Sequence, residues 1–454
     1  MRPETMYALV EERIGEFLRE PLDRRLAERA RLIALDTLAV IVRGYREPDV
    51  RALADGSVAR DDGALPLALP LRRIDALRAI LCNTASAAAL ELCEGHRRAK
   101  GHIALQVLPA LLAAAEVHRV PGRRVLPALV LGYEIAARMG AASERYFRTH
   151  GHGIWAAAGS AVAVATVLGR DARQIVECLK IASNLSLAPS FSTHAEGATV
   201  RNLTAGLGGM IGYWVPEFLQ AGYCGSLSAM AVTLGEALGS EFSPAQFVEG
   251  LGEHWCVLDN YFKFDASGRH VQPAAQALRE LIGSQAHDAA GVSRIRVETY
   301  RPASQLSNRA PPNALAAKTS IPYAIAAQWR VGHLGVEAFD AERLSDPGLR
   351  ALMQRVEVLE GQPDPEAAAD PAARWARVIV EWEGGDRRVG YCANPPGEGE
   401  QAASPAMLRA KYDALTVPML GERRASRLHG LMENIEQVSD VGQGLEQALA
   451  DLDR

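Results

Sequence analysis

The stretch GIWAAAGSAVAVATVLG, residues 153–169, predicts a buried helix. Small apolar residues fill it, and no charged residue or proline interrupts it. The flanking stretches place apolar residues at three- and four-residue spacing, the period of an α-helix: 22–42, 76–92, 104–118 and 122–140. From Met6 to about Asn260 we therefore expect a tightly packed, almost continuously helical structure.

The pattern changes near residue 290. VSRIRVETY, residues 292–300, alternates apolar and polar side chains, which is typical of a half-buried strand. Further strands are expected within 353–361 and 374–393, and 374–393 turns at 383–386. A helix is expected over 314–332, and 364–373 is expected to be a polar loop.

The stretch 393–405, ANPPGEGEQAASP, has the composition of a linker, and a helical pattern returns after it and continues to Arg454. The sequence therefore predicts a mainly α protein. A large helical domain is expected to use both chain ends, residues 1–265 and 397–454. A smaller α+β lid domain is expected over 266–396.

Composition excludes several classes of protein. The 454 residues are 48% hydrophobic and carry a net charge of −5, which is typical of a globular protein and not of a nucleic-acid-binding one. No apolar run approaches the roughly 20 residues that span a membrane. The N-terminus lacks a signal-peptide core, and the six cysteines form no C-x-x-C pair. We expect a cytoplasmic protein.

Titratable residues gather in segments that enter apolar helices or join the two predicted domains. These segments are 91–102 (ELCEGHRRAKGH), 149–155 (THGHGIW), 194–206 (HAEGATVRNLTAG) and 260–270 (NYFKFDASGRH). Each is also typical of a solvated loop, a helix cap or a local ion pair. Their shared position favours function, because helix N-termini attract anions, arginine binds carboxylates and histidine titrates near neutral pH. A pocket for a small carboxylate is the expected site.

The order of these segments resembles the MmgE/PrpD superfamily, which contains 2-methylcitrate dehydratase, cis-aconitate decarboxylase and iminodisuccinate epimerase. The resemblance covers nearly the whole chain. It rests on the acidic loop before Gly101-His102 and on an ordered set of stretches: 107–116, 129–140, 150–169, 196–206, 220–225, 260–263, 315–327 and the closing strand pair.

The resemblance implies a homodimer whose site lies between the helical domain and the lid. It also implies a small di- or tricarboxylate substrate, and no metal or organic cofactor. His102, His150 and Lys263 resemble catalytic positions of the family. The residues expected to bind substrate are Glu91, His96, His152, Arg201 and Arg269.

Several positions depart from the family's usual pattern. In the acidic loop, Cys93 replaces an aspartate and His96 an asparagine. After the junction lysine, Ser267 and Gly268 stand where a cysteine is common, and Gln272 stands where a histidine is frequent. These departures leave the specific reaction open.

The leading hypothesis is a cofactor-independent lyase. Histidines would move protons, and arginine and lysine would hold substrate carboxylates while a carbanion forms. An isomerase, either an epimerase or a cyclase, is the alternative, and a non-catalytic binding protein is a third. A metal-dependent hydrolase that uses His150, His152 and Glu91 or Glu94 is disfavoured, because loops that flank helices give no fixed ligand geometry.

Overall fold

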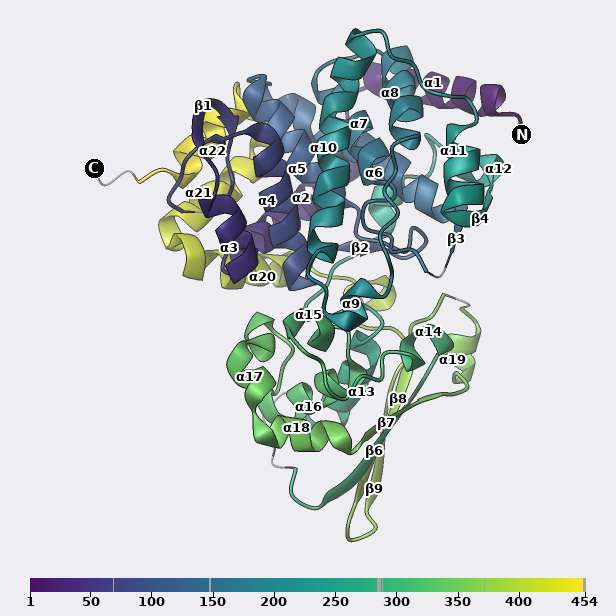
Figure 1. Cartoon of the computed structure of the whole chain (residues 1–454), viewed down its shortest axis with the longest axis vertical. Coiled ribbons are helices and arrows are strands. Elements are labelled where there is room, and N and C mark those ends of the chain that lie inside the picture. The colour runs from purple at the N-terminus through teal and green to yellow at the C-terminus, as the bar shows by residue number, and fades with distance from the viewer. Residues whose placement is uncertain (68, 147, 284–286, 288, 371, 452–454) are drawn as a thin grey trace.

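The computed structural model describes residues 1–67, 69–146, 148–283, 287, 289–370 and 372–451. Its helices far outnumber its strands, so the predicted mainly α fold is confirmed. Figure 1 shows a helical body that contains both chain ends and, below it, a part built around a small sheet. The predicted boundaries between the two domains stay predictions.

The helical body is built from the first half of the chain. Its helices are α1 (Pro3–Arg19), α2 (Arg24–Gly44), α3 (Pro48–Asp55), α4 (Ala76–Leu90), α5 (Ala104–Val117), α6 (Val125–Ala141), α7 (Ala156–Val167), α8 (Ala172–Ser183), α9 (Thr193–Glu196), α10 (Arg201–Gln220), α11 (Ala229–Val232) and α12 (Pro244–Val248). Helix α7 lies at the centre and contacts α5, α6, α8 and α10. All its residues are buried, as the opening stretch predicts.

The expectation of nearly unbroken helix to Asn260 was incomplete. Short strands interrupt this region: β1 (Ala59–Ala64), β2 (Gly95–His96), β3 (Ser143–Arg145) and β4 (Gly239–Phe242). Strand β3 pairs with β4, and β2 pairs with β5 (Asn260–Tyr261). Strands β2, β3 and β4 are too short to display an alternating pattern, and β1, with the sequence ARDDGA, is mostly polar. The β2–β5 pair matters most, because it joins the acidic loop to the junction segment.

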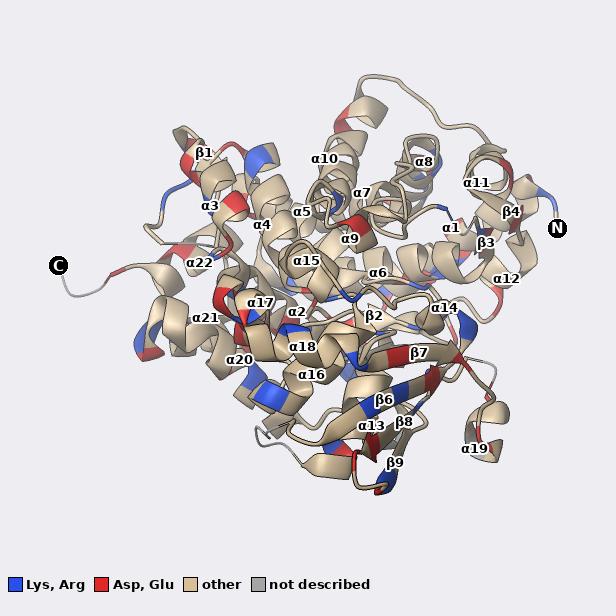
Figure 2. Ribbon diagram, turned by 60° about the horizontal axis from the view of Figure 1, so that its bottom comes forward, with Lys and Arg blue, Asp and Glu red and all other residues tan. Residues whose placement is uncertain are grey.

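The second half of the chain contains a four-stranded sheet in the order β7-β6-β8-β9. Its strands are β6 (Val292–Thr299), β7 (Val356–Glu360), β8 (Ala376–Trp382) and β9 (Arg387–Cys392). Strand β6 pairs in parallel with β7 and antiparallel with β8. The predicted strands are thereby confirmed. Ion pairs such as Arg377–Glu298, at 2.9 Å, cross between neighbouring strands, and Figure 2 shows both charge signs on them.

Helices cover the buried side of the sheet: α13 (Gln272–Ile282), α16 (Ile321–Val331) and α18 (Pro347–Gln354). Shorter helices complete this part: α14 (Arg301–Ser304), α15 (Ala314–Ala317), α17 (Ala341–Ser345) and α19 (Pro365–Ala368). The helix expected over 314–332 is broken, because the Ser320 side chain caps a new helix by accepting from the Tyr323 amide. The expected loop 364–373 contains α19, and its residue 371 lies outside the described residues.

The chain returns to the helical body after the linker, as predicted. Helices α20 (Pro405–Leu420) and α21 (Glu422–Glu433) contact α2, and α22 (Val441–Leu449) contacts α5. Figure 1 shows these yellow helices beside the purple N-terminal ones. Residues 452–454 of this predicted helical stretch lie outside the described part. Among the described residues, no helix has both the length and the apolarity needed to cross a membrane.

Candidate active site

The candidate site begins where helix α4 ends. The Asp75 side chain caps its start by accepting from the amides of Leu77 and Arg78. At the other end, Glu91 takes the left-handed conformation with φ at 54° and leaves the helix axis. The last carbonyls of a helix carry partial negative charge and attract cations. Arg201 donates to Ala88 O at 3.1 Å, and Lys318 donates to Ala89 O at 2.8 Å.

Glu91 lies within this group of cations. Its carboxylate pairs with Arg201 and lies 3.5 Å from Lys263 Nζ, and all three side chains are buried. Burial would raise the pKa of Glu91, but Arg201 and Lys263 hold it well below its usual range. Burial lowers the pKa of Lys263 to about 8, and Glu91 opposes that shift. With Lys318, the region holds more positive than negative charge.

His102 precedes helix α5, and its orientation is set by the acidic loop. Its Nδ1 lies 2.7 Å from the carbonyl oxygen of Glu94. A carbonyl only accepts, so Nδ1 carries the proton and Nε2 of the neutral ring is an acceptor. Burial and then Lys263 lower the pKa of His102 to about 3. His102 is therefore neutral near pH 7 and has the tautomer that a base needs.

Glu94 itself is held deep in the loop. Its carboxyl accepts from the Ala104 amide and from Tyr133 Oη, both at 2.8 Å. Burial raises the pKa of Glu94 to about 7. These bonds tie the acidic loop to the start of α5 and to α6, which holds the Glu94 carbonyl against His102.

Three more imidazoles continue from His102. The ring centroids are 5.5 Å apart for His102 and His152, 4.6 Å for His152 and His150, and 5.7 Å for His150 and His194. The four rings will be called the histidine row. Nδ1 of His150 accepts from the His152 amide at 3.1 Å, so the neutral His150 ring carries its proton on Nε2. Burial lowers the pKa of His150 and of His152 well below the usual value.

One end of the row borders a small cavity that is too narrow to admit a water molecule. Its lining residues are Ala87, Ala88, Glu91, Cys93, His102, Leu105 and His152. The His152 ring is buried, and neither of its nitrogens has a hydrogen-bond partner among the described residues. The structure thus brings Glu91, His102, His150, His152, Arg201 and Lys263 together, although they are far apart in the sequence.

Two predicted binding residues lie outside this group. His96 accepts from the Ala99 amide at 3.1 Å and packs edge-on against Tyr133, 6.3 Å between ring centroids. Arg269 donates to Pro395 O at 2.9 Å and pairs with Glu398 at 2.8 Å, both in the linker. Both side chains are bound locally, and their predicted roles in substrate binding stay predictions.

The unusual junction residues also have local partners. Gln272 accepts from Arg269 at 2.7 Å and donates to the carbonyl of Asp265 at 3.0 Å. A histidine has one ring acceptor and one donor when neutral, so it would need a particular tautomer to make both bonds. Ser267 is buried, and its hydroxyl has no partner among the described residues.

The sequence reasoning missed two residues of the site. His194, from α9, was part of a recognised cluster but was not chosen, because a single histidine beside an arginine does not show which ring it will contact. Lys318 was read as part of a helix, whereas the break before α16 lets it reach the end of α4. Cys93, known from the sequence only as a departure, lines the cavity.

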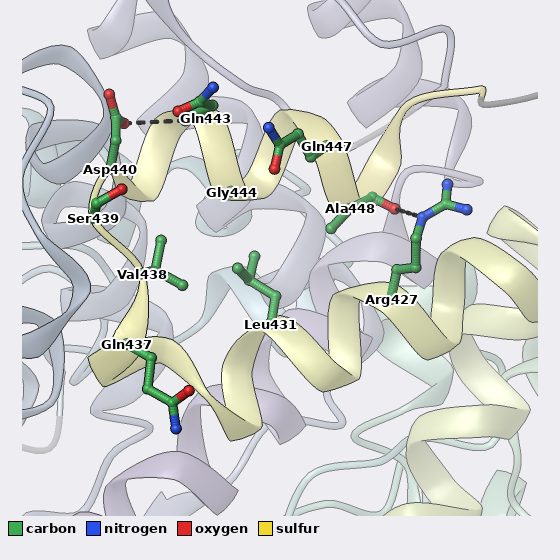
Figure 3. A pocket seen from close by; sticks show the side chains of 10 residues that line it. All are labelled: Arg427, Leu431, Gln437, Val438, Ser439, Asp440, Gln443, Gly444, Gln447 and Ala448. Atoms are coloured by element: carbon green, nitrogen blue, oxygen red, sulfur yellow. Dashed lines mark hydrogen bonds between the residues drawn. The ribbon is translucent and has the colours of Figure 1, made fainter.

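A second hollow lies far along the chain from these residues. Figure 3 shows it between α21 and α22, with Leu431 and Val438 among its lining side chains. Arg427 beside it donates to Ala448 O at 3.1 Å, which ties the two helices together. It contains none of the predicted site residues. Across the described part of the chain, no three His, Cys, Asp or Glu side chains are grouped in a way that could hold a metal ion.

Comparison with known proteins identifies relatives over almost the whole chain. It is 24% identical to cis-aconitate decarboxylase of Aspergillus terreus over 452 residues, which cover 92% of this chain and 91% of that protein. It is also 24% identical to the cis-aconitate decarboxylase-like protein oryM of Aspergillus oryzae, over 82% of each chain. The MmgE/PrpD N-terminal domain model matches residues 14–237, and the C-terminal domain model matches residues 266–437. The resemblance expected from the sequence is thereby confirmed, and the chain belongs to the MmgE/PrpD family.

Proposed function

We propose that this chain is a lyase that acts on a small di- or tricarboxylate through a carbanion, by decarboxylation or dehydration. The observation that carries the proposal is the buried cluster around Glu91, where acid/base side chains and cations meet. The names of its relatives point to decarboxylation of cis-aconitate as the first reaction to test. We expect no metal or organic cofactor to be needed.

Recognition of the substrate falls to the cations. Arg201 and Lys263 are the proposed carboxylate clamps, and both pair with Glu91 in the structure. A substrate carboxylate would share or replace the bonds that Glu91 makes. The N-termini of three helices add to this attraction for the substrate. Arg201 is the first residue of α10, His102 lies just before α5, and His152 lies just before α7. The positive ends of three helices therefore face the same region, which favours an anion.

Proton transfer falls to the imidazoles. The Nε2 acceptor of His102 suits it to take a proton from the carbon next to a carboxylate. His150 offers an Nε2–H that can donate to a substrate oxygen. The ammonium of Lys263 would stabilise the negative charge that develops on the substrate. Positioned cations are most effective in a buried site such as this, where water does not screen them.

The test is an NMR assay of the purified chain in D2O with cis-aconitate, 2-methylcitrate and related di- and tricarboxylates. Decarboxylation would appear as CO2 and a deuterated product, and dehydration as an alkene. The isomerase alternative would appear as deuterium exchange without loss of CO2 or water. His102→Ala should lower turnover by roughly 10²-fold or more, the usual contribution of a positioned acid or base. Neither turnover nor exchange with any of these compounds would contradict the proposal.

A further inference from the structure

His152 differs from every other member of the histidine row. His102 and His150 each use Nδ1 in a bond to the backbone, whereas both nitrogens of His152 lack partners among the described residues. The side chain is 1% exposed, so water does not cover these nitrogens from the surface. Buried polar atoms are normally hydrogen-bonded, and an exception calls for an explanation such as a ligand. The narrow cavity next to the ring does not admit water, so a ligand would reach these nitrogens only if the cavity walls moved apart.

Hydrogen bonds hold the backbone that carries this ring. Gln106, on α5, donates to His102 O at 2.6 Å and accepts from the Gly153 amide at 3.0 Å. One amide side chain thus joins the backbone beside His102 to the backbone beside His152. The His152 amide donates to His150 Nδ1, which ties the backbone of His152 to the next ring of the row. A ring carried on a backbone held in this way, with both nitrogens free, is suited to acid/base chemistry.

We propose that His152 is a catalytic residue, the proton donor of the reaction in this cavity, with His102 as the base that faces it. This inference rests on the proposed lyase function and assigns His152 a role beyond binding the substrate. The two rings stand edge to face at 76°, with centroids 5.5 Å apart, on the wall of the same cavity. A small carboxylate that entered as the cavity walls moved apart would lie within reach of both rings, because both line the cavity.

The proton balance differs between the two lyase reactions. In a dehydration, the C–H electron pair stays on carbon as the proton passes to His102 Nε2, and the C–O pair leaves with oxygen, which takes a proton from His152 to form water. Donor and base then exchange one proton before the next turnover. In a decarboxylation, the C–C pair stays on the substrate carbon as CO2 leaves, and the carbanion takes the His152 proton. His152 is then reprotonated from solvent. The other histidines of the row provide the route for this proton, because His150 and His194 extend from His152 toward the exposed residues Ser190 and Ser192.

His152 must be protonated before it can donate. Burial, Arg201 and the neighbouring imidazoles of His150 and His102 hold its pKa well below the usual value. Lys263 acts in the same direction. A bound polycarboxylate places negative charge against these groups and raises the pKa of an imidazole beside it. The donor proton therefore arrives with the substrate.

The first test compares full-length His152→Gln with the wild type on whichever carboxylate the wild type converts. Glutamine keeps hydrogen-bonding atoms but does not transfer protons. We expect kcat to fall by roughly 10²-fold or more with KM changed by less than about threefold, and the alkaline limb of the pH profile to disappear. His118→Gln is the matched control, because His118 is exposed at the far end of α5. It should leave the kinetics and the profile unchanged.

Several outcomes would overturn the inference. Wild-type kcat in His152→Gln would overturn it, as would a rise in KM alone or a lowered kcat with the alkaline limb intact. A wild type that converts no carboxylate overturns the proposed function, and this inference with it. An active wild type with an equally active variant overturns the inference alone.

A second measurement avoids substitution and so covers a variant that fails to fold. Propane-1,2,3-tricarboxylate has neither the double bond nor the hydroxyl of a substrate and serves as an inert probe. ¹⁵N NMR of the wild-type side chains should show His152 changing from a neutral ring to one with both nitrogens protonated when the probe binds. A His152 ring that stays neutral in the bound state would overturn the inference.

Discussion

At the scale of single residues, Glu91 and Arg201 explain why the site is both charged and buried. Arg201 neutralises Glu91 and caps α4 through the carbonyl of Ala88. Removing one partner of a buried ion pair leaves the other charge without compensation, whereas replacing both is far less harmful. The two residues therefore stabilise the fold only as a pair.

We predict that Arg201→Met lowers the free energy of unfolding by about 3 kcal/mol or more. The double variant Glu91→Gln with Arg201→Met should recover most of that loss, because no unpaired carboxylate remains. Urea unfolding of the four proteins of this cycle at pH 7 measures both values. A double variant less stable than Arg201→Met would show that Glu91 is stabilised by Lys263 alone.

The pKa values also predict how stability depends on pH. Burial lowers the pKa of His102 to about 3 and that of His96 to about 4, against roughly 6.5 in the unfolded chain. Groups of this kind contribute stability above pH 6.5 and lose it as the pH falls toward their folded values. Burial raises the pKa of Glu116 from 4.5 to about 8, so its contribution is fully present below pH 4.5 and is lost progressively as the pH rises to 8.

We therefore expect maximum stability near pH 6.5 and a loss of about 2 kcal/mol from each of these two histidines at pH 5. His96→Asn tests this, since asparagine can accept from the Ala99 amide as His96 does but does not titrate. Its free energy of unfolding should fall by about 2 kcal/mol less than that of the wild type between pH 7 and pH 5. Equal losses in the two proteins would contradict the role of His96.

At the scale of elements, the packing of α7 against α10 depends on residues without side-chain bulk. A Cβ at Gly212 would lie 2.5 Å from Ser160 Cβ and 2.6 Å from Ala157 O. Both contacts are shorter than atoms tolerate, and backbone at such an interface shifts only at a cost. The close approach brings the start of α10, with Arg201, toward the segment that carries His150 and His152.

We predict that Gly212→Ala lowers the free energy of unfolding by about 1–3 kcal/mol. Gly430→Ala is its control, because Gly430 lies within α21 and a Cβ there meets no atom within 4 Å. That change should raise the free energy of unfolding by about 0.5–1 kcal/mol, since alanine is the better helix former. Thermal or urea unfolding distinguishes the two, and equal effects would contradict this account of the interface.

Sequence reasoning predicted elements best where their pattern is long. Helix α7 and strand β6 each show a full period in the sequence, and both form as expected. The pair β2–β5 is too short to show any period and depends on contacts between residues more than 160 positions apart. The break at Ser320 depends on one capping hydroxyl within an otherwise helical pattern.

In the candidate site, too, the sequence predicted only what a local pattern can show. Histidine, arginine and lysine beside helix starts could be selected from the sequence. The neighbours of each ring could not, because tautomers and empty space depend on the folded backbone. His96 and His102 lie in the same loop, yet only His102 lines the cavity. No spacing in the sequence separates them.

At the scale of the whole molecule, α10 presents an unusual surface. One side of it is buried against α7 through small residues such as Ala205, Gly208 and Gly212. The opposite side is also apolar: Val200 just before the helix is 56% exposed, Leu207 41% and Trp214 38%, and the partly buried Leu203, Met210, Ile211 and Phe218 lie between them. Exposed polar residues on α10, Glu217 and Gln220, lie near its end, and the apolar remainder of this side is of the kind that is normally covered. Large exposed apolar patches on proteins commonly mark an interface.

We predict that the chain is a homodimer and that this face of α10 forms part of its interface. Light scattering at micromolar concentration should give twice the 48.8 kDa mass of one chain. Leu207→Glu with Trp214→Glu should shift the mass to that of a monomer, because a dimer would have to bury two charges from each subunit without partners.

Val389→Glu is the control, since Val389 is 49% exposed on strand β9, away from α10, and its substitution should leave the dimer intact. A wild-type mass of 48.8 kDa would contradict the dimer, and a dimer that survives both α10 substitutions would place the interface elsewhere. The result also bears on the site, because α10 begins with Arg201, so an interface along this helix would stabilise the element that holds the proposed carboxylate clamp.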